Sequence, residues 1–454
     1  YMDRYLLTAS MRADGSSKFG KDNKWGYFPS VSAAWRASEE EFIKNLDVFS
    51  NLKVRLSYGT AVNNRIENYR SLALYSSDWV PMGIQAVPIY SGRMANPGLK
   101  WETTVSSNAG LDLSFFNHRV QATADLYSTR TKDLLLEAQI PYLSGYKSIL
   151  KNVGETKNTG FEFSVTTYNI QNKDFTWSTS FNIATNKNKV VKLADASYLE
   201  WKSAWNGDFN DIDYLIAEGQ PLGQMYGYEY DGIYTVDQFD FVNGEYKLKA
   251  GEIAIEGVNV QPGYYKYKNQ NPDEDNMINS KDKKVIGRAT PDFFGGITNN
   301  FTYKGFDLSI FLNFSVGNDI YNANRMYGDN LTPKLRNSMT YAKDRFTFID
   351  GTGNNLHGDP AALAKLNEGK RIASVQGVGS NMKFHSLYID DGSFLRINNI
   401  TLGYTVPRAL LRKASIQSLR IYASGYNLHT FTKYKGYDPE VNTNSNKGLT
   451  PGID

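Results

Sequence analysis

The sequence contains no cysteine, which excludes a disulfide scaffold and any metal site built from thiolates. It has no uninterrupted apolar run long enough for a transmembrane helix, and it does not open with the charged-then-apolar segment of a signal peptide. Acids and bases are interspersed, with a net charge of +3, so there is no basic stripe of the kind that binds nucleic acid. These absences remove several large classes of protein.

Motifs of catalysis are missing as well. The chain has no G-x-S-x-G elbow, no P-loop and no H-E-x-x-H helix. Its 4 histidines are far apart in the sequence, and nothing marks them as metal ligands or as a catalytic base. We therefore expect no catalytic residues and no enzymatic activity.

Aromatic residues are abundant, at 14% of the chain, and apolar residues often recur at every second position. The clearest case is Phe306 to Phe314, where apolar even positions alternate with Asp307, Ser309 and Asn313. A similar arm ends at Tyr303, and only Lys304-Gly305 separates the two. The pattern predicts a tight hairpin whose arms approach the length of about nine to eleven residues that a tilted strand needs to cross a bilayer.

The same alternation recurs along the whole chain and predicts about eleven strands. They cover Tyr5 to Met11, Val31 to Trp35, Leu52 to Tyr58, Trp101 to Phe115, Val120 to Leu126, Phe161 to Val165, Phe175 to Ile183, Ile297 to Tyr303, Phe306 to Phe314, Phe394 to Val406 and Leu419 to Leu428.

Connection lengths between these strands differ in a regular way. Short and moderate connections alternate with long ones near 62–99, 129–157, 188–283 and 322–390. Short periplasmic turns and long extracellular loops are typical of an all-β transmembrane antiparallel barrel. A soluble β-solenoid or propeller is the alternative, and the lack of a fixed short repeat counts against it.

Eleven strands cannot close on themselves as a single-chain bacterial barrel, because such barrels have even strand numbers. An open sheet would also leave two rows of unpaired backbone groups in hydrocarbon. The alternation begins at once, at Tyr5, and no closing strand pattern follows Thr450. We therefore expect residues 1–454 to be an internal piece of a larger barrel.

Six stretches of the sequence are similar to one known family. They are RYLLTASMRADGSSKFG (4–20), WGYFPSVSAAW (25–35), NPGLKWETT (96–104), GFEF (160–163), SFLRINNITLGY (393–404) and GYDPEV (436–441). In this order they resemble the C-terminal half of SusC/RagA-type TonB-dependent outer-membrane transporters of Bacteroidota. The resemblance implies a barrel of about 22 strands, of which this chain holds the eleventh to the twenty-first. By this resemblance, we expect the family's TonB box, plug, first barrel half and last strand to lie outside residues 1–454.

The resemblance further implies active import of a large nutrient, an oligosaccharide or a peptide, driven by the TonB complex through the plug. A SusD/RagB-like surface lipoprotein would cover the long loops as a lid, and pairs of transporter and lipoprotein could dimerise within the outer-membrane lipid. Two alternatives stay open: a secreted or surface β-rich glycan-binding protein, and a TonB-dependent signalling receptor.

One candidate metal site lies in the longest loop. Oxygen-bearing side chains there follow the spacing of a calcium-binding loop, and they are Asn271, Asp273, Asp275, Asn279 and Asp282. Asn271 stands where a charged first ligand is usual, and Asn276 stands where the turn glycine is usual. The alternative is a solvated polar turn without an ion.

Aromatic residues in the long loops could stack on sugar rings or on peptide side chains. The candidates are Trp79, Tyr90, Trp201, Trp205 and Tyr327. The alternative is that they pack the loops against themselves. Trp25, Trp35, Trp101 and Trp177 lie near strand ends, where we expect them to form the aromatic girdle of a membrane barrel.

Overall fold

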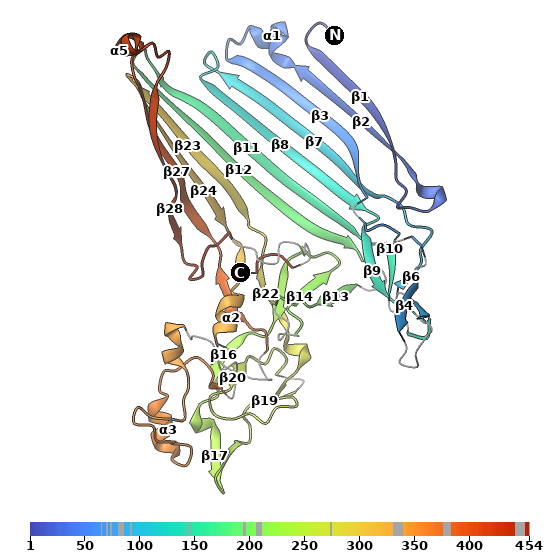
Figure 1. The fold of residues 1–454 in the computed structure, drawn as a ribbon, viewed down its shortest axis with the longest axis vertical. Coiled ribbons are helices and arrows are strands. Elements are labelled where there is room, and N and C mark those ends of the chain that lie inside the picture. The colour runs from blue at the N-terminus through green and yellow to red at the C-terminus, as the bar shows by residue number, and fades with distance from the viewer. Residues whose placement is uncertain are drawn as a thin grey trace.

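The structure is a computed structural model (Figure 1). It describes residues 1–64, 66–69, 71–72, 75–79, 86–90, 93–140, 142–144, 146, 148–193, 197–205, 211–272, 275–329, 339–375, 383–440 and 450–453.

The dominant element is one antiparallel sheet of 11 strands, ordered in space as they are in the chain. Its strands, in order, are β1 (Tyr5–Gly15), β2 (Trp25–Arg36), β3 (Phe49–Asn63), β7 (Glu102–Phe115), β8 (Val120–Lys132), β11 (Glu155–Gln171), β12 (Phe175–Lys192), β23 (Phe293–Tyr303), β24 (Phe306–Val316), β27 (Phe394–Thr405) and β28 (Arg420–Thr432). The prediction of an all-β antiparallel fold with eleven long strands is confirmed. Most of the strands extend beyond their predicted ends.

One side of this sheet is apolar, and we call it the apolar face. A row of directly opposed residues on it runs through Leu56, Ala109, Leu126 and Phe161. Leu56 and Leu126 are more than half exposed, at 57% and 60%. Large exposed apolar side chains along a whole sheet face are unfavourable in water, so this face requires an apolar environment.

The opposite side, the polar face, is held by ion pairs and hydroxyl pairs. Arg55 donates to both carboxylate oxygens of Asp112 (3.0 and 2.9 Å) and to Asp125 (3.0 Å), which joins β3, β7 and β8. Hydroxyl pairs link neighbouring strands on the same face, namely Ser10 with Ser30, Thr104 with Thr131, Ser106 with Thr129, Thr166 with Ser180 and Thr401 with Ser424.

The two ends of the sheet differ, as Figure 1 shows. At the turn end, connections are short and carry α1 (Glu41–Lys44) and α5 (Arg408–Leu411). The turn between β23 and β24 is Lys304-Gly305, and both residues have positive φ, which suits the two-residue turn that the sequence predicts. At the loop end lie the long connections, with α2 (Ala323–Asp329) and α3 (Pro360–Leu366).

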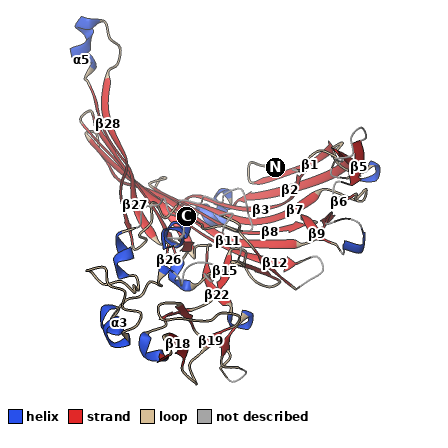
Figure 2. Ribbon diagram, turned by 60° about the horizontal axis from the view of Figure 1, so that its bottom comes forward, coloured by secondary structure: helices blue, strands red, loops and turns tan. Residues whose placement is uncertain are grey.

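The sheet is bent, as Figure 2 shows. Its two outer strands are β1 and β28. Among the described residues, each of these two strands pairs with a single neighbour. Within the same residues, no helix combines the length and apolar character needed to span a bilayer.

Small sheets fill the connections at the loop end. Their strands are β4 (Tyr75–Trp79) with β5 (Ala86–Tyr90); β6 (Arg93–Met94), β10 (Ser148–Asn152) and β9 (Leu135–Gln139); β13 (Tyr198–Trp201), β14 (Tyr214–Ala217), β15 (Gln224–Gly227) and β22 (Lys284–Arg288); β16 (Tyr230–Ile233) with β20 (Tyr265–Tyr267); β17 (Phe239–Val242) with β18 (Glu245–Leu248); β19 (Ala254–Ile255) with β21 (Met277–Ile278); and β25 (Asp319–Tyr321) with β26 (Ile389–Asp391).

The girdle prediction is wrong for Trp101. This side chain is only 8% exposed and packs against Phe19 and Phe28, with ring centroids 5.0 and 5.8 Å away. Leu99 completes the same buried cluster. Trp101 therefore fixes two connections to each other at the loop end of β2 and β7, and it does not lie on the apolar face.

Candidate functional site

The two longest connections, 193–292 and 317–393, fold together at the loop end, and we call their described part the loop body. Asp211 links them, because its carboxylate accepts from Lys283 Nζ (3.1 Å) in the first connection and from the Phe384 amide (3.3 Å) in the second. Pro451 and Ile453 also enter it: Tyr214 donates to the Pro451 carbonyl (2.7 Å), and Ile453 is fully buried. The loop body is thus an ordered unit rather than a set of independent loops.

Tyrosine is the most frequent residue in its core. Fully or almost fully buried members include Tyr214, Tyr234, Tyr265, Tyr267, Tyr321 and Tyr388. Each ring supplies apolar surface, and its hydroxyl needs a partner when it is buried. Tyr234, for example, donates to the Ile253 carbonyl, and Tyr265 and Tyr388 share a hydrogen bond of 3.0 Å.

His385 lies at the centre of this core with no exposed surface. Its ring packs against those of four tyrosines, at centroid distances of 4.6 to 5.6 Å, and these are Tyr230, Tyr265, Tyr267 and Tyr388. Neither ring nitrogen has a hydrogen-bond partner among the described residues. Burial lowers the pKa of His385 to about 3, with a smaller contribution from the charge of Arg325. The imidazole is therefore neutral at physiological pH.

A buried polar chain continues from this core towards α2. Tyr388 donates to the Asp329 carboxylate (3.1 Å), and Arg345 donates to the Asp329 carbonyl (2.5 Å). Burial raises the pKa of the Asp329 carboxyl above its usual range. This chain joins the tyrosine core to the end of α2.

The predicted calcium loop closes through its own hydrogen bonds. Asp282 accepts from the amides of Gln270 (2.7 Å) and Asn279 (2.8 Å), while Asp275 accepts from the Met277 amide and from Asn279 Nδ2. Asp273 lies outside the described residues. Among those described, no three acidic or histidine side chains converge as a metal site. The donor set, carboxylates and amides, still has the oxygen chemistry that Ca²⁺ prefers.

The five candidate aromatic residues differ in their packing and exposure. Trp205 packs inside the loop body and donates to the Tyr321 hydroxyl (2.8 Å), with Tyr327 at its edge. Trp201, on β13, is 38% exposed. Trp79 and Tyr90 lie on paired strands β4 and β5, and their side chains are outside the described residues. Trp201 and Tyr327 are thus partly exposed, whereas Trp205 is largely used in packing.

Arg396 forms an ion cluster that sequence reasoning did not single out. It is 5% exposed on β27 and donates to Asp438 and Glu440 at 2.5 Å each. Its Nε also donates to the Thr430 hydroxyl (3.0 Å). The cluster fastens the segment after β28 to the sheet. The available clue was that Arg396 and the two acids belong to two of the six stretches that carry the family resemblance.

The sequence is similar to one protein family and to several known relatives. Residues 1–264 match a family model described as TonB dependent receptor-like, beta-barrel. TonB-dependent receptor P3 of Formosa agariphila is 36% identical over 461 aligned residues, which cover 100% of this chain and 43% of that protein. TonB-dependent receptor SusC of Bacteroides thetaiotaomicron is 32% identical, over 97% of this chain and 40% of its own length. The chain thus spans less than half the length of these relatives.

Among solved structures, the RagAB peptide importer in its closed-closed state is similar to this chain. The match has a TM-score of 0.76 and 25% identity, and it covers 99% of this chain and 44% of that one. The RagAB peptide transporter gives a TM-score of 0.75 with the same identity. The similarity therefore extends through the loop body as well as the sheet.

The His385 environment generates a pH prediction. Since the folded-state pKa lies below the ordinary value of 6.5, the unfolded chain takes up this proton first, and stability falls as the pH drops from 6.5 towards 3. The loss is about 1.4 kcal/mol for each pH unit in that range. We expect His385→Phe to remove it, because phenylalanine suits the aromatic surroundings and leaves no unpaired ring nitrogen.

The measurement is thermal unfolding of the full-length protein in detergent at pH 7 and pH 5, followed by the near-ultraviolet circular dichroism of the tyrosines. The control is His429→Phe, because His429 is exposed on β28 and should not change the pH dependence. An equal pH dependence in wild type and His385→Phe would contradict the assignment.

Proposed function

Because this chain belongs to the TonB-dependent receptor-like β-barrel family, we propose that it forms half of an outer-membrane transporter that imports a large polar nutrient. The chain is a segment of an outer-membrane β-barrel. The proposed cargo is an oligosaccharide or a peptide, and the proposed energy source is the TonB complex acting on a plug domain. No catalytic step is part of this proposal.

The observation that carries the proposal is the two-faced sheet, whose two outer strands each pair with a single neighbour among the residues that the structure describes. The apolar face suits lipid, and the ion and hydroxyl pairs of the polar face suit a wet lumen. Strands β1 and β28 need further strands, since open edges in hydrocarbon cost several kcal/mol for each unpaired group. About 22 strands would enclose a lumen wide enough for a plug.

The loop body supports the proposal of a lipoprotein partner. We propose that the loop end faces the cell exterior and that a SusD/RagB-like lipoprotein covers it as a lid. A lid that opens and closes needs a firm base, and the buried tyrosine core with its Asp211 link supplies one. The similar RagAB assembly is named a peptide importer, which favours a peptide cargo over an oligosaccharide. We also propose that two pairs of transporter and lipoprotein associate as a dimer.

We also propose that the loop of Asn271, Asp273, Asp275, Asn279 and Asp282 binds Ca²⁺. The ion would compete with the hydrogen bond from Asn279 Nδ2 to Asp275 (2.8 Å), so binding should be weak. Dissociation constants of about 10⁻³ M are typical of weak extracellular calcium sites. Its role would be to stiffen the loop body.

A matched pair of substitutions tests which face meets lipid. Ile310 lies near the middle of β24 on the apolar face, and its neighbour Ser309 lies on the polar face. In the full-length protein, Ile310→Arg should destabilise the barrel by about 2–4 kcal/mol, the cost of arginine at the bilayer midplane, whereas Ser309→Arg should change little. Urea titration in lipid vesicles measures both, and equal losses would argue against a lipid-facing apolar side.

Uptake tests the function itself. Cells that produce the full-length protein and its lipoprotein are given a mixture of labelled oligosaccharides and peptides, and depletion from the medium is followed by mass spectrometry. We expect one class to be depleted, and only when TonB is present. Ligand binding without depletion, together with a transcriptional response, would instead identify a signalling receptor. A protein that purifies without detergent would identify a soluble glycan-binding protein.

Calcium binding is tested by thermal unfolding of the full-length protein in millimolar Ca²⁺ or in EDTA. We expect stabilisation by Ca²⁺ that is lost in Asp275→Asn. Asp231→Asn is the control, because Asp231 is half-exposed in the loop body and outside this loop. Equal unfolding temperatures with and without Ca²⁺ would mean that the loop is closed by its own hydrogen bonds alone.

A further inference from the structure

A group of cations lies on the apolar face, close to the loop end. Arg130 on β8 is directly opposite Lys157 on β11, which is directly opposite Lys189 on β12. Directly opposed residues of an antiparallel sheet share a face, and strands lie about 4.8 Å apart. The three side chains therefore form one row about 10 Å long. Lys187 lies on the same face, two residues nearer the middle of β12.

These cations are exposed and have few acidic neighbours. Arg130, Lys157, Lys187 and Lys189 are all exposed, and within the described residues the three lysines form no ion pair. Arg130 alone is paired, with Glu155. On the polar face, by contrast, Arg55 is neutralised by two aspartates. The row thus carries an excess of positive charge at the edge of an otherwise apolar surface.

The row lies at the height where hydrocarbon ends. Ten residue steps separate Arg130 from Val120 at the turn end of β8. At about 3.4 Å per residue and a tilt of about 40°, this is roughly 26 Å along the membrane normal. The apolar band of an outer-membrane barrel is about 25 Å tall. The cations therefore meet the polar headgroups and not the acyl chains.

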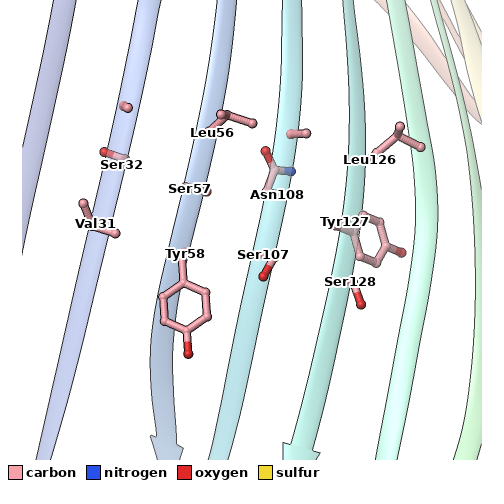
Figure 3. Close-up of a pocket in the computed structure, with 12 residues that line it drawn as sticks. Val31, Ser32, Leu56, Ser57, Tyr58, Ser107, Asn108, Leu126, Tyr127 and Ser128 are labelled. Atoms are coloured by element: carbon pink, nitrogen blue, oxygen red, sulfur yellow. The ribbon is translucent and has the colours of Figure 1, made fainter.

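Figure 3 shows a shallow apolar groove on the same face, which lies on the turn-end side of the row. It has a volume of about 520 Å³, with Leu56 and Tyr58 on one side, Leu126 on the other, and the small side chains of Ser107 and Ala109 between them. Ser128 also lines it and is two residues from Arg130 on β8. An acyl chain in this groove would therefore place its headgroup beside the cations.

We propose that Arg130, Lys157, Lys187 and Lys189 bind the phosphate of an outer-leaflet glycolipid whose acyl chain occupies the groove over Ala109. This site rests on the proposed orientation, with the loop end outside the cell. A phosphate is a strong acceptor for several lysines, and clustered cations at a membrane surface attract anionic lipid. The apolar faces of β1, β2 and β3 carry no such cations. The glycolipid is thus expected at one part of the barrel wall.

The test uses the full-length protein in mild detergent, titrated with monophosphoryl lipid A and followed by microscale thermophoresis. The triple variant Lys157→Gln, Lys187→Gln, Lys189→Gln should bind on the order of 100-fold more weakly, at about fivefold for each cation removed. The matched control removes three lysines of the loop body, Lys247→Gln, Lys249→Gln and Lys365→Gln, and should bind as wild type does.

Two further arms address the headgroup and the groove. Dephosphorylated lipid A should bind wild type as weakly as lipid A binds the triple variant, and Ala109→Phe should weaken binding by filling the groove with an apolar side chain. Unchanged affinity in the triple variant would overturn the proposal. Phosphatidylglycerol binding as tightly as lipid A would overturn the assignment to a glycolipid. Uptake is measured with the same variants, so that failure of import and failure of lipid binding are scored separately.

Discussion

Backbone hydrogen bonding in hydrocarbon is the constraint on which the rest of this structure depends. Where no water is present, each amide and carbonyl of a spanning strand needs a partner on a neighbouring strand. The chain meets this demand by pairing consecutive long strands without a change of order, from β1 to β28. The long connections are then confined to the two ends of the sheet, although irregular pairing also interrupts β24, β27 and β28 within it. Among the described residues, each of the two outer strands has a partner on one side only.

The loop body solves a different problem, which is how two long connections become a single ordered surface. Tyrosine suits this task because its ring fills a core while its hydroxyl satisfies a buried acceptor, as between Tyr234 and the Ile253 carbonyl. His385 is the exception, since its side chain contributes a ring and forms no hydrogen bond within the described part of the chain. Together with buried isoleucine, valine, phenylalanine and methionine, these tyrosines form a core at the loop end, beyond the spanning strands.

Much of the sheet could be predicted from the sequence, and little of the loop end could. Alternation along Phe306 to Phe314 reports a strand because one face is apolar and the other polar, and the hairpin at Lys304-Gly305 follows from spacing alone. Trp101 shows the limit: it continues the alternation of β7 but packs against Phe19, a contact between distant residues that no local pattern reveals. The same is true of Trp205 on Tyr321 and of Arg396 with Asp438. The row formed by Arg130, Lys157 and Lys189 depends on strand register, which becomes visible only in the folded sheet.

The loop body also has a consequence for the order in which the chain assembles. Pairing β12 with β23, and β24 with β27, requires the chain to close over the two longest connections, and the entropic cost of closure grows with the length of a flexible loop. If these connections fold first, their compact core shortens the distance between the strand ends that must meet. Hairpins such as β23 with β24 form from residues close in the sequence, so their pairing does not depend on the folding of a long connection. The tyrosine core would then hold the end of β12 near β23, and the end of β24 near β27, while these strands pair.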